Sequence, residues 1–233
     1  MKNRQRIRSL SALDIEYSIK HGIDKREKAI ENKIMQNFEY HYYMFHKPYG
    51  CVTARRDDTY PTVMDYFRSL GNPDLSPVGR LDLESEGLLF ITDDGKWNGR
   101  MTEPSCRKEK IYEFVVMGCL TEAAAKTLEQ GIRLPQSDHI TAPAKVEITA
   151  RSTFQRTIAD IPPEIAEKLK RNLPDTPTTY GRITITEGKK HQVRKMMKAV
   201  GCYVIRLKRI SMGGIPLDPT LLPGQWKAFD PFI

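Results

Sequence analysis

One carboxylate of this chain, Asp82, lies in a pattern that could support chemistry, Gly79-Arg80-Leu81-Asp82. The apolar run Gly87-Leu88-Leu89-Phe90-Ile91-Thr92 follows closely and predicts a buried strand. A carboxylate placed beside such a strand can act as a nucleophile or as a general base. For so short a pattern, the commoner explanation is a loop aspartate that caps a helix or forms a surface ion pair. Glu84 and Glu86 are competing carboxylates, but we expect Asp82 to be the reactive one.

Three further segments make this pattern more specific. They are Phe45-His46-Lys47-Pro48-Tyr49-Gly50, Lys108-Glu109-Lys110-Ile111-Tyr112 and Glu187-Gly188-Lys189-Lys190-His191-Gln192-Val193-Arg194-Lys195-Met196. Together with the Asp82 segment they resemble, in the same order, four motifs of the pseudouridine synthases, and within them the small-subunit ribosomal type and its close relatives. The resemblance covers about residues 43–228, and it continues through Val204-Ile205-Arg206-Leu207-Lys208-Arg209. Four motifs in order are far more specific than any one of them.

The hydrophobic pattern predicts strands and helices in irregular alternation. Strands are expected at 43–45, 87–92, 110–117, 182–186 and 203–207, and helices at 62–70, 121–130, 163–173 and 191–200. Because no regular βαβ repeat emerges, the predicted fold class is α+β. The resemblance implies a mixed, mostly antiparallel sheet with flanking helices and a central catalytic cleft.

Two regions of the chain depart from that pattern. Residues 1–40 are expected to form a separate basic, helical segment, too short for the S4-type RNA-binding module that many relatives carry. Residues 41–233 are expected to form the catalytic domain, with a surface insertion at about 150–179.

The resemblance implies isomerisation of uridine, which breaks the N1–C1′ bond and forms a C5–C1′ bond. It makes Asp82 the catalytic carboxylate, acting on the sugar or in proton removal, and Arg194 its ion-pair partner. It places Tyr112 against the target base with a role in proton transfer, and Leu207 as an apolar wall beside the uracil. Without the resemblance these three would be explained as a phosphate-binding arginine, a half-buried strand tyrosine and a core leucine.

The net charge of +8 is concentrated in one part of the chain. Nine basic residues lie between Arg182 and Arg209, and only Glu187 opposes them. Such a local excess suits a polyanion, although a solvated face without a partner is the alternative. The residues expected to contact RNA are Arg80, Lys110, Lys189, Lys190, Gln192, Lys195, Leu207 and Arg209. We expect His46, His191 and Cys51 to be structural or to lie beside the RNA, and not to be catalytic.

Several other classes of protein are disfavoured. The four cysteines have no C-x-x-C spacing and the five histidines form no H-x-x-x-H pair, so we expect no metal. Nucleotide-binding fingerprints are also missing, so we expect no cofactor. No apolar run is long enough to cross a bilayer, and the N-terminus lacks a secretory signal. We therefore expect a monomer in the cytoplasm, with no membrane partner.

The sequence thus predicts site-specific formation of pseudouridine in ribosomal RNA or a pre-ribosomal particle. Small-subunit RNA is the favoured target, and large-subunit RNA is the alternative. A non-catalytic RNA-binding or ribosome-assembly protein would use the same basic residues but would not need Asp82. Hydrolytic cleavage of RNA is disfavoured, because the chain offers neither paired histidines nor a cluster of metal-binding carboxylates.

Overall fold

One large sheet organises the part of the chain that carries the motifs. The computed structural model describes residues 40–135, 137–169 and 174–232. The chain divides into two units, residues 1–40 and 41–233, and the sheet belongs to the second. The helices expected before residue 40 lie outside the described residues.

The sheet is mixed and mostly antiparallel, as predicted. Its nine strands are β1 (Tyr42–Lys47), β2 (Ser76–Val78), β3 (Glu86–Thr92), β4 (Lys110–Met117), β5 (Lys145–Thr153), β6 (Pro177–Ile185), β7 (Tyr203–Met212), β8 (Ile215–Pro216) and β9 (Trp226–Ala228). The main path runs β5-β6-β4-β7-β3-β1-β9, with β2 beside β3 and β8 beside β7. Among the described strands only β3 and β7 pair in parallel.

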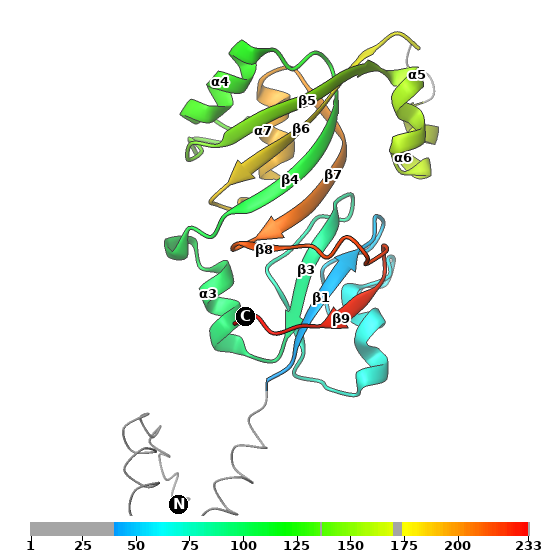
Figure 1. The fold of residues 1–233 in the computed structure, drawn as a ribbon, viewed down its shortest axis with the longest axis vertical. Coiled ribbons are helices and arrows are strands. Elements are labelled where there is room, and N and C mark those ends of the chain that lie inside the picture. Colours follow the sequence, from blue (N-terminus) through cyan, green and yellow to red (C-terminus); the bar gives the residue numbers. More distant parts are fainter. Residues whose placement is uncertain (1–39, 136, 170–173, 233) are drawn as a thin grey trace, which may run out of the picture. The chain divides into compact units, whose positions relative to one another are not determined.

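Helices flank both halves of this sheet. The α-helices are α3 (Gly95–Thr102), α4 (Glu122–Gln130), α5 (Phe154–Thr157), α6 (Pro163–Leu169) and α7 (Gln192–Ala199). Short 3₁₀ helices occupy η1 (Val63–Leu70), η2 (Pro104–Cys106) and η3 (Ile158–Asp160). In Figure 1, α7 lies behind the upper half of the sheet, whereas α3 lies beside the lower half that contains β1, β3 and β9. The chain leaves β5 at residue 154 and returns in β6 at residue 177, with α5 and α6 between them.

Local sequence accounts for most of these elements. The predicted period of α7 is confirmed, because Val193, Met196 and Met197 are buried against the sheet. The helix α3 was not predicted, because Asp93-Asp94-Gly95 was interpreted only as a turn. Asp94 is instead the N-cap of α3, and its Oδ1 accepts hydrogen bonds from the first-turn amides of Lys96 and Trp97.

A single glycine allows the two halves of the sheet to join. Gly87 in β3 pairs with Arg209 in β7 and has φ +102°, a conformation that favours glycine. A Cβ at this position would lie 2.3 Å from the Arg209 carbonyl oxygen and 2.8 Å from its amide nitrogen. The parallel contact between β3 and β7 therefore requires a residue without a side chain.

Replacement of Gly87 by alanine should destabilise the domain by at least about 3 kcal/mol, because strained backbone and a backbone clash would coincide. Chemical denaturation measures this loss. The matched control is Gly99→Ala in α3, where an added Cβ meets open space. The control should be neutral or stabilising by up to about 1 kcal/mol. Equal stability of the two variants would contradict the role assigned to Gly87.

Candidate active site

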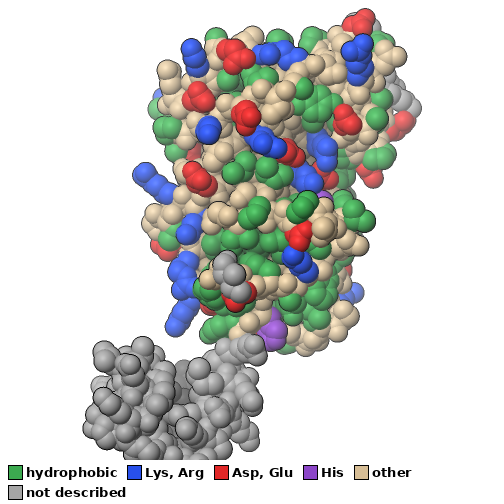
Figure 2. Space-filling view, in the orientation of Figure 1, with side chains coloured by type: hydrophobic (Ala, Val, Ile, Leu, Met, Phe, Trp, Pro, Cys, Tyr) green, Lys and Arg blue, Asp and Glu red, His purple; other side chains and the backbone are tan. Residues whose placement is uncertain are grey.

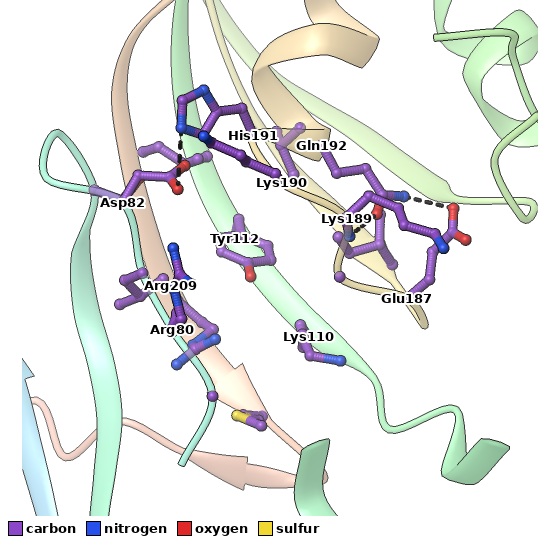
Figure 3. A pocket seen from close by; sticks show the side chains of 18 of the residues that line it. Arg80, Asp82, Lys110, Tyr112, Glu187, Lys189, Lys190, His191, Gln192 and Arg209 are labelled. Atoms are coloured by element: carbon purple, nitrogen blue, oxygen red, sulfur yellow. Dashed lines mark hydrogen bonds and ion pairs between the residues drawn. The ribbon is translucent and has the colours of Figure 1, made fainter. Parts of the chain in front are cut away.

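A cavity of about 390 Å³ opens where the two halves of the sheet meet. One side is formed by residues 79–82, which precede β3, and the other by residues 185–194, which lead into α7. Strands β4 and β7 supply its floor through Lys110, Tyr112, Leu207 and Arg209. Figure 3 shows Asp82 on one rim, His191 and Lys190 across from it, and Tyr112 between and below them. The volume lies within the range of about 300–1,000 Å³ usual for ligand pockets.

The loop that carries Asp82 is held through its main chain. Each of the five consecutive backbone carbonyls from residue 81 to residue 85 accepts a hydrogen bond. Backbone amides donate to two of them: Ser85 N to the Asp82 carbonyl and Gly50 N to the Leu83 carbonyl, both at 3.0 Å. Side chains donate to the other three: Thr53 Oγ1 to Leu81 (2.8 Å), Arg194 Nη2 to Glu84 (2.6 Å) and Lys47 Nζ to Ser85 (2.7 Å). The side chain of Asp82, in contrast, accepts no hydrogen bond from the described residues. A fixed backbone thus presents to the cavity a carboxylate that accepts no hydrogen bond from the described residues.

The expected ion pair between Arg194 and Asp82 does not form, and this prediction needs correction. Arg194 donates from Nη2 to the Glu84 carbonyl and from Nη1 to the Val204 carbonyl, at 2.6 and 3.2 Å. Its Nη1 also lies 3.5 Å from Oε2 of Glu84. The guanidinium therefore clamps the Asp82 loop to β7, and it lines the cavity without pairing with the Asp82 carboxylate.

Lys47 is the second cation behind this loop, and sequence reasoning assigned it no role. Its side chain is fully buried, and Nζ donates to the carbonyls of Ser85 and Pro48 at 2.7 and 3.0 Å. Burial lowers the pKa of Lys47 to about 8, although the nearby Cys51 and Asp82 oppose this shift. The amine stays protonated at neutral pH, where it joins the turn after β1 to the Asp82 loop.

The opposite rim is held by a partly buried carboxylate–amide network. Oε1 of Glu187 accepts from the Gln192 side-chain amide at 2.6 Å and from the Ala142 backbone at 3.0 Å. Its Oε2 lies 3.1 Å from Nε2 of His139. The Gln192 Oε1 atom in turn accepts from the Lys189 backbone at 2.8 Å. Gln192, predicted to bind RNA, lines the cavity, and both ends of its amide make hydrogen bonds within the protein that shape the rim.

The floor residues were predicted to share one face, and they do. Lys110 and Tyr112 both line the cavity, as the period of two along β4 requires. Tyr112 is 7 % exposed and lies opposite Arg209 in β7. Arg209 is almost completely buried, its Nε donates to the Leu88 carbonyl at 2.8 Å, and its Nη2 has no partner among the described residues. Burial and the nearby Arg209 charge both lower the pKa of Lys110.

The basic residues of the 182–209 segment do not form one face. Alternation along β7 sends Leu207 and Arg209 to the cavity, and Arg206 and Lys208 to the other side of the sheet. There Arg206 pairs with Glu86 at 2.8 Å and Arg182 pairs with Glu113 at 3.1 Å. Figure 2 shows acidic and basic side chains interspersed over the face in view. The concentrated field expected from the sequence is therefore divided and partly neutralised.

The remaining predicted residues fall on or near the rim. Arg80, Lys189 and Lys190 line the cavity, whereas Lys195 does not. His46 is a buried residue of β1, and its Nδ1 lies 2.7 Å from the Leu221 carbonyl, consistent with the structural role expected. Within the described ranges no group of three or more metal-binding side chains occurs, and no helix is long and apolar enough to span a membrane.

Comparisons with known proteins agree with this geometry. The sequence model of the RNA pseudouridylate synthase family matches residues 41–199. "Ribosomal small subunit pseudouridine synthase A" of Pseudomonas aeruginosa is 36 % identical over 186 residues, which is 80 % of this chain and 69 % of that protein. The protein of the same name from Escherichia coli is 32 % identical over 196 residues, 84 % of this chain and 73 % of that protein.

A solved structure shares the fold. A crystal structure of a pseudouridylate synthase superposes with a TM-score of 0.66 at 31 % sequence identity. The match covers 82 % of this chain and 71 % of that chain. The family resemblance of the four motifs therefore extends to the arrangement of the sheet.

The depressed pKa of Lys47 predicts how stability should depend on pH. Between its folded pKa of about 8 and its ordinary value of 10.5, the unfolded chain binds more protons than the folded one. Stability contributed by this group must therefore rise with pH across that window, by at most about 1.4 kcal/mol per pH unit. Relative to Lys47→Met, the wild-type free energy of unfolding should increase from pH 8 to pH 10. A difference independent of pH in denaturation experiments would contradict the burial of a charged amine here.

Proposed function

The chain belongs to the RNA pseudouridylate synthase family, and from that premise we propose that it converts one uridine of small-subunit ribosomal RNA to pseudouridine. The relatives named above carry that target in their names, and they match more than two thirds of their own length. The same reaction on large-subunit RNA is the alternative. The proposal includes a monomeric enzyme acting in the cytoplasm on ribosomal RNA or a pre-ribosomal particle.

One observation supports Asp82 as the catalytic carboxylate. Its backbone is fixed by hydrogen bonds on every neighbouring carbonyl, while its side chain lines the cavity and accepts none from the described residues. Such preorganisation holds a reactive group in place before substrate arrives. The reaction is an isomerisation: the N1–C1′ bond breaks, C5 bonds to C1′, C5 loses a proton and N1 gains one. A single carboxylate can attack C1′ or begin the proton transfer.

The floor of the cavity suits a detached base. Tyr112 and Leu207 present an aromatic and an apolar surface side by side on β4 and β7. A uridine in structured RNA must be extruded from its stack to reach them, at a cost of a few kcal/mol. Arg80, Lys189 and Lys190 on the rim can offset part of this cost by attracting the RNA backbone.

Replacement of Asp82 by asparagine should abolish pseudouridine formation and leave RNA affinity within about tenfold, equivalent to about 1.4 kcal/mol. The carboxylate serves the bond exchange, whereas the rim cations bind phosphate. Single-turnover assays and filter binding measure the two effects separately.

The matched control for this variant is Glu84→Gln in the same loop. Its carboxylate contacts Arg194 and does not line the cavity, so activity should stay within a few-fold of wild type.

Mapping of ribosomal pseudouridines in cells with and without the gene identifies the target. Normal product from the asparagine variant would rule out the catalytic role.

Substrate selection should depend on RNA shape. Rim cations supply attraction to the backbone that carries little sequence information. Folded small-subunit RNA or a partly assembled particle should be modified at least tenfold faster than a short unstructured oligonucleotide with the same local sequence. Rates are compared at physiological salt. Equal rates on the two substrates would show that local sequence suffices.

A further inference from the structure

His191 lies beside the Asp82 carboxylate, where the sequence led us to expect Arg194. Its Nε2 lies 3.6 Å from Oδ1 of Asp82, an ion-pair distance that Figure 3 marks across the mouth of the cavity. Arg194, the expected partner, is engaged with Glu84 and Val204. Of the described residues, His191 alone makes an ion-pair contact with the Asp82 carboxylate.

The backbone of His191 is held in an unusual conformation. Its φ of +55° and ψ of +32° lie in the left-handed region, which costs a residue with a Cβ roughly 1–2 kcal/mol. Only one other described non-glycine residue, Arg107, has positive φ. Strained backbone of this kind persists where the surroundings impose it, and it is concentrated at functional sites.

The surroundings that impose this conformation are on the rim itself. Gln192 accepts from the Lys189 amide through its side chain and donates to the Lys189 carbonyl through its backbone, at 2.8 and 3.0 Å. Glu187 ties the Gln192 amide to the segment near Ala142. The turn that leads into α7 is thus closed on itself, and it holds the half-exposed imidazole 3.6 Å from Asp82.

Other charged or titratable groups line the same cavity, and none of those described has a hydrogen bond or ion pair with the Asp82 carboxylate. They include Arg80 on the Asp82 loop, Lys110 and Tyr112 on β4, Arg209 on β7, and Lys189, Lys190 and Arg194 on the rim. Among them Lys110 donates to the Lys108 carbonyl, and Arg209 donates to the Leu88 carbonyl. Neither of these two donates to the Asp82 carboxylate.

We propose that His191 is a positioning residue for Asp82: its imidazole N–H orients the free carboxylate toward the substrate cavity. This rests on the proposed catalytic role of Asp82. The loop clamps fix only the main chain of Asp82, so the side-chain torsions need a separate restraint. A small movement converts the 3.6 Å contact into a hydrogen bond when RNA closes the mouth of the cavity.

Two substitutions separate the imidazole from the backbone conformation. His191→Gly accepts the left-handed backbone freely but has no donor. His191→Gln keeps an N–H donor of similar reach on a residue that has the same backbone preference as histidine. We expect kcat to fall about tenfold in the glycine variant with KM within twofold, and about threefold in the glutamine variant. The free energy of unfolding should rank the two variants the other way: the glycine variant should be at least as stable as wild type, and the glutamine variant less stable than the glycine variant.

If the role of His191 were purely structural, kcat would follow stability, and the glycine variant would be more active than the glutamine variant. A glycine variant with kcat within twofold of wild type, or a glutamine variant no better than glycine, would overturn the proposal. Lys190→Gln on the adjacent rim residue controls for loss of positive charge, and it should raise KM rather than lower kcat. Asp82→Asn is measured in parallel. Activity in that variant would remove the assigned role of Asp82, whereas an inactive Asp82→Asn beside a fully active His191→Gly would reject only the role of His191.

Discussion

The approach of Gly87 to the Arg209 backbone is the constraint on which the site depends. At this point β3 and β7 pair in parallel over only two residue pairs, and two largely antiparallel half-sheets become one sheet. The loop of Asp82 immediately precedes β3, while β7 carries Leu207 and Arg209 into the cavity. A side chain at position 87 would force the strands apart, and the carboxylate would move away from the floor it faces.

The site also shows how a protein can fix the backbone around a carboxylate without neutralising its charge. Lys47 and Arg194 are both cations, and both bind carbonyl oxygens of the loop rather than the Asp82 carboxylate. Charge-assisted hydrogen bonds of this kind are about twice as strong as neutral ones, and they satisfy backbone groups that a buried turn would otherwise leave unpaired. The carboxylate remains open to the cavity, and its one ion-pair contact among the described residues is with His191 on the opposite rim.

The distribution of charge explains why net charge alone is a poor guide to the RNA surface. The strand period of two places adjacent residues of β7 on opposite faces of the sheet, so Lys208 and Arg209 cannot act on the same ligand. Pairs with Glu86 and Glu113 neutralise two cations of the far face. The cations left for RNA at the mouth of the cavity are few, and they lie on loops rather than on the sheet.

Local interactions made much of the fold predictable from sequence. The burial of β3, the bounds of β4, the Thr121 cap of α4 and the apolar stripe of α7 all follow from patterns within a few residues, and the structure confirms them. The order of four motifs likewise determined the family. Local signals were insufficient where one pattern is typical of two structures. Asp93-Asp94-Gly95 is typical both of a turn and of a helix N-terminus, and in the structure it begins α3.

Tertiary structure decided the partners within the site. Arg194 and the Glu84 carbonyl are separated by 110 residues, and no periodicity indicates that the arginine meets the backbone of the loop instead of its carboxylate. His191 was set aside because a histidine in a basic motif has many ordinary explanations, and only the folded chain brings it to 3.6 Å from Asp82. Sequence determined which residues surround the cavity because motifs are local. Which atoms meet inside it depends on distances between strands that pack together only in the folded domain.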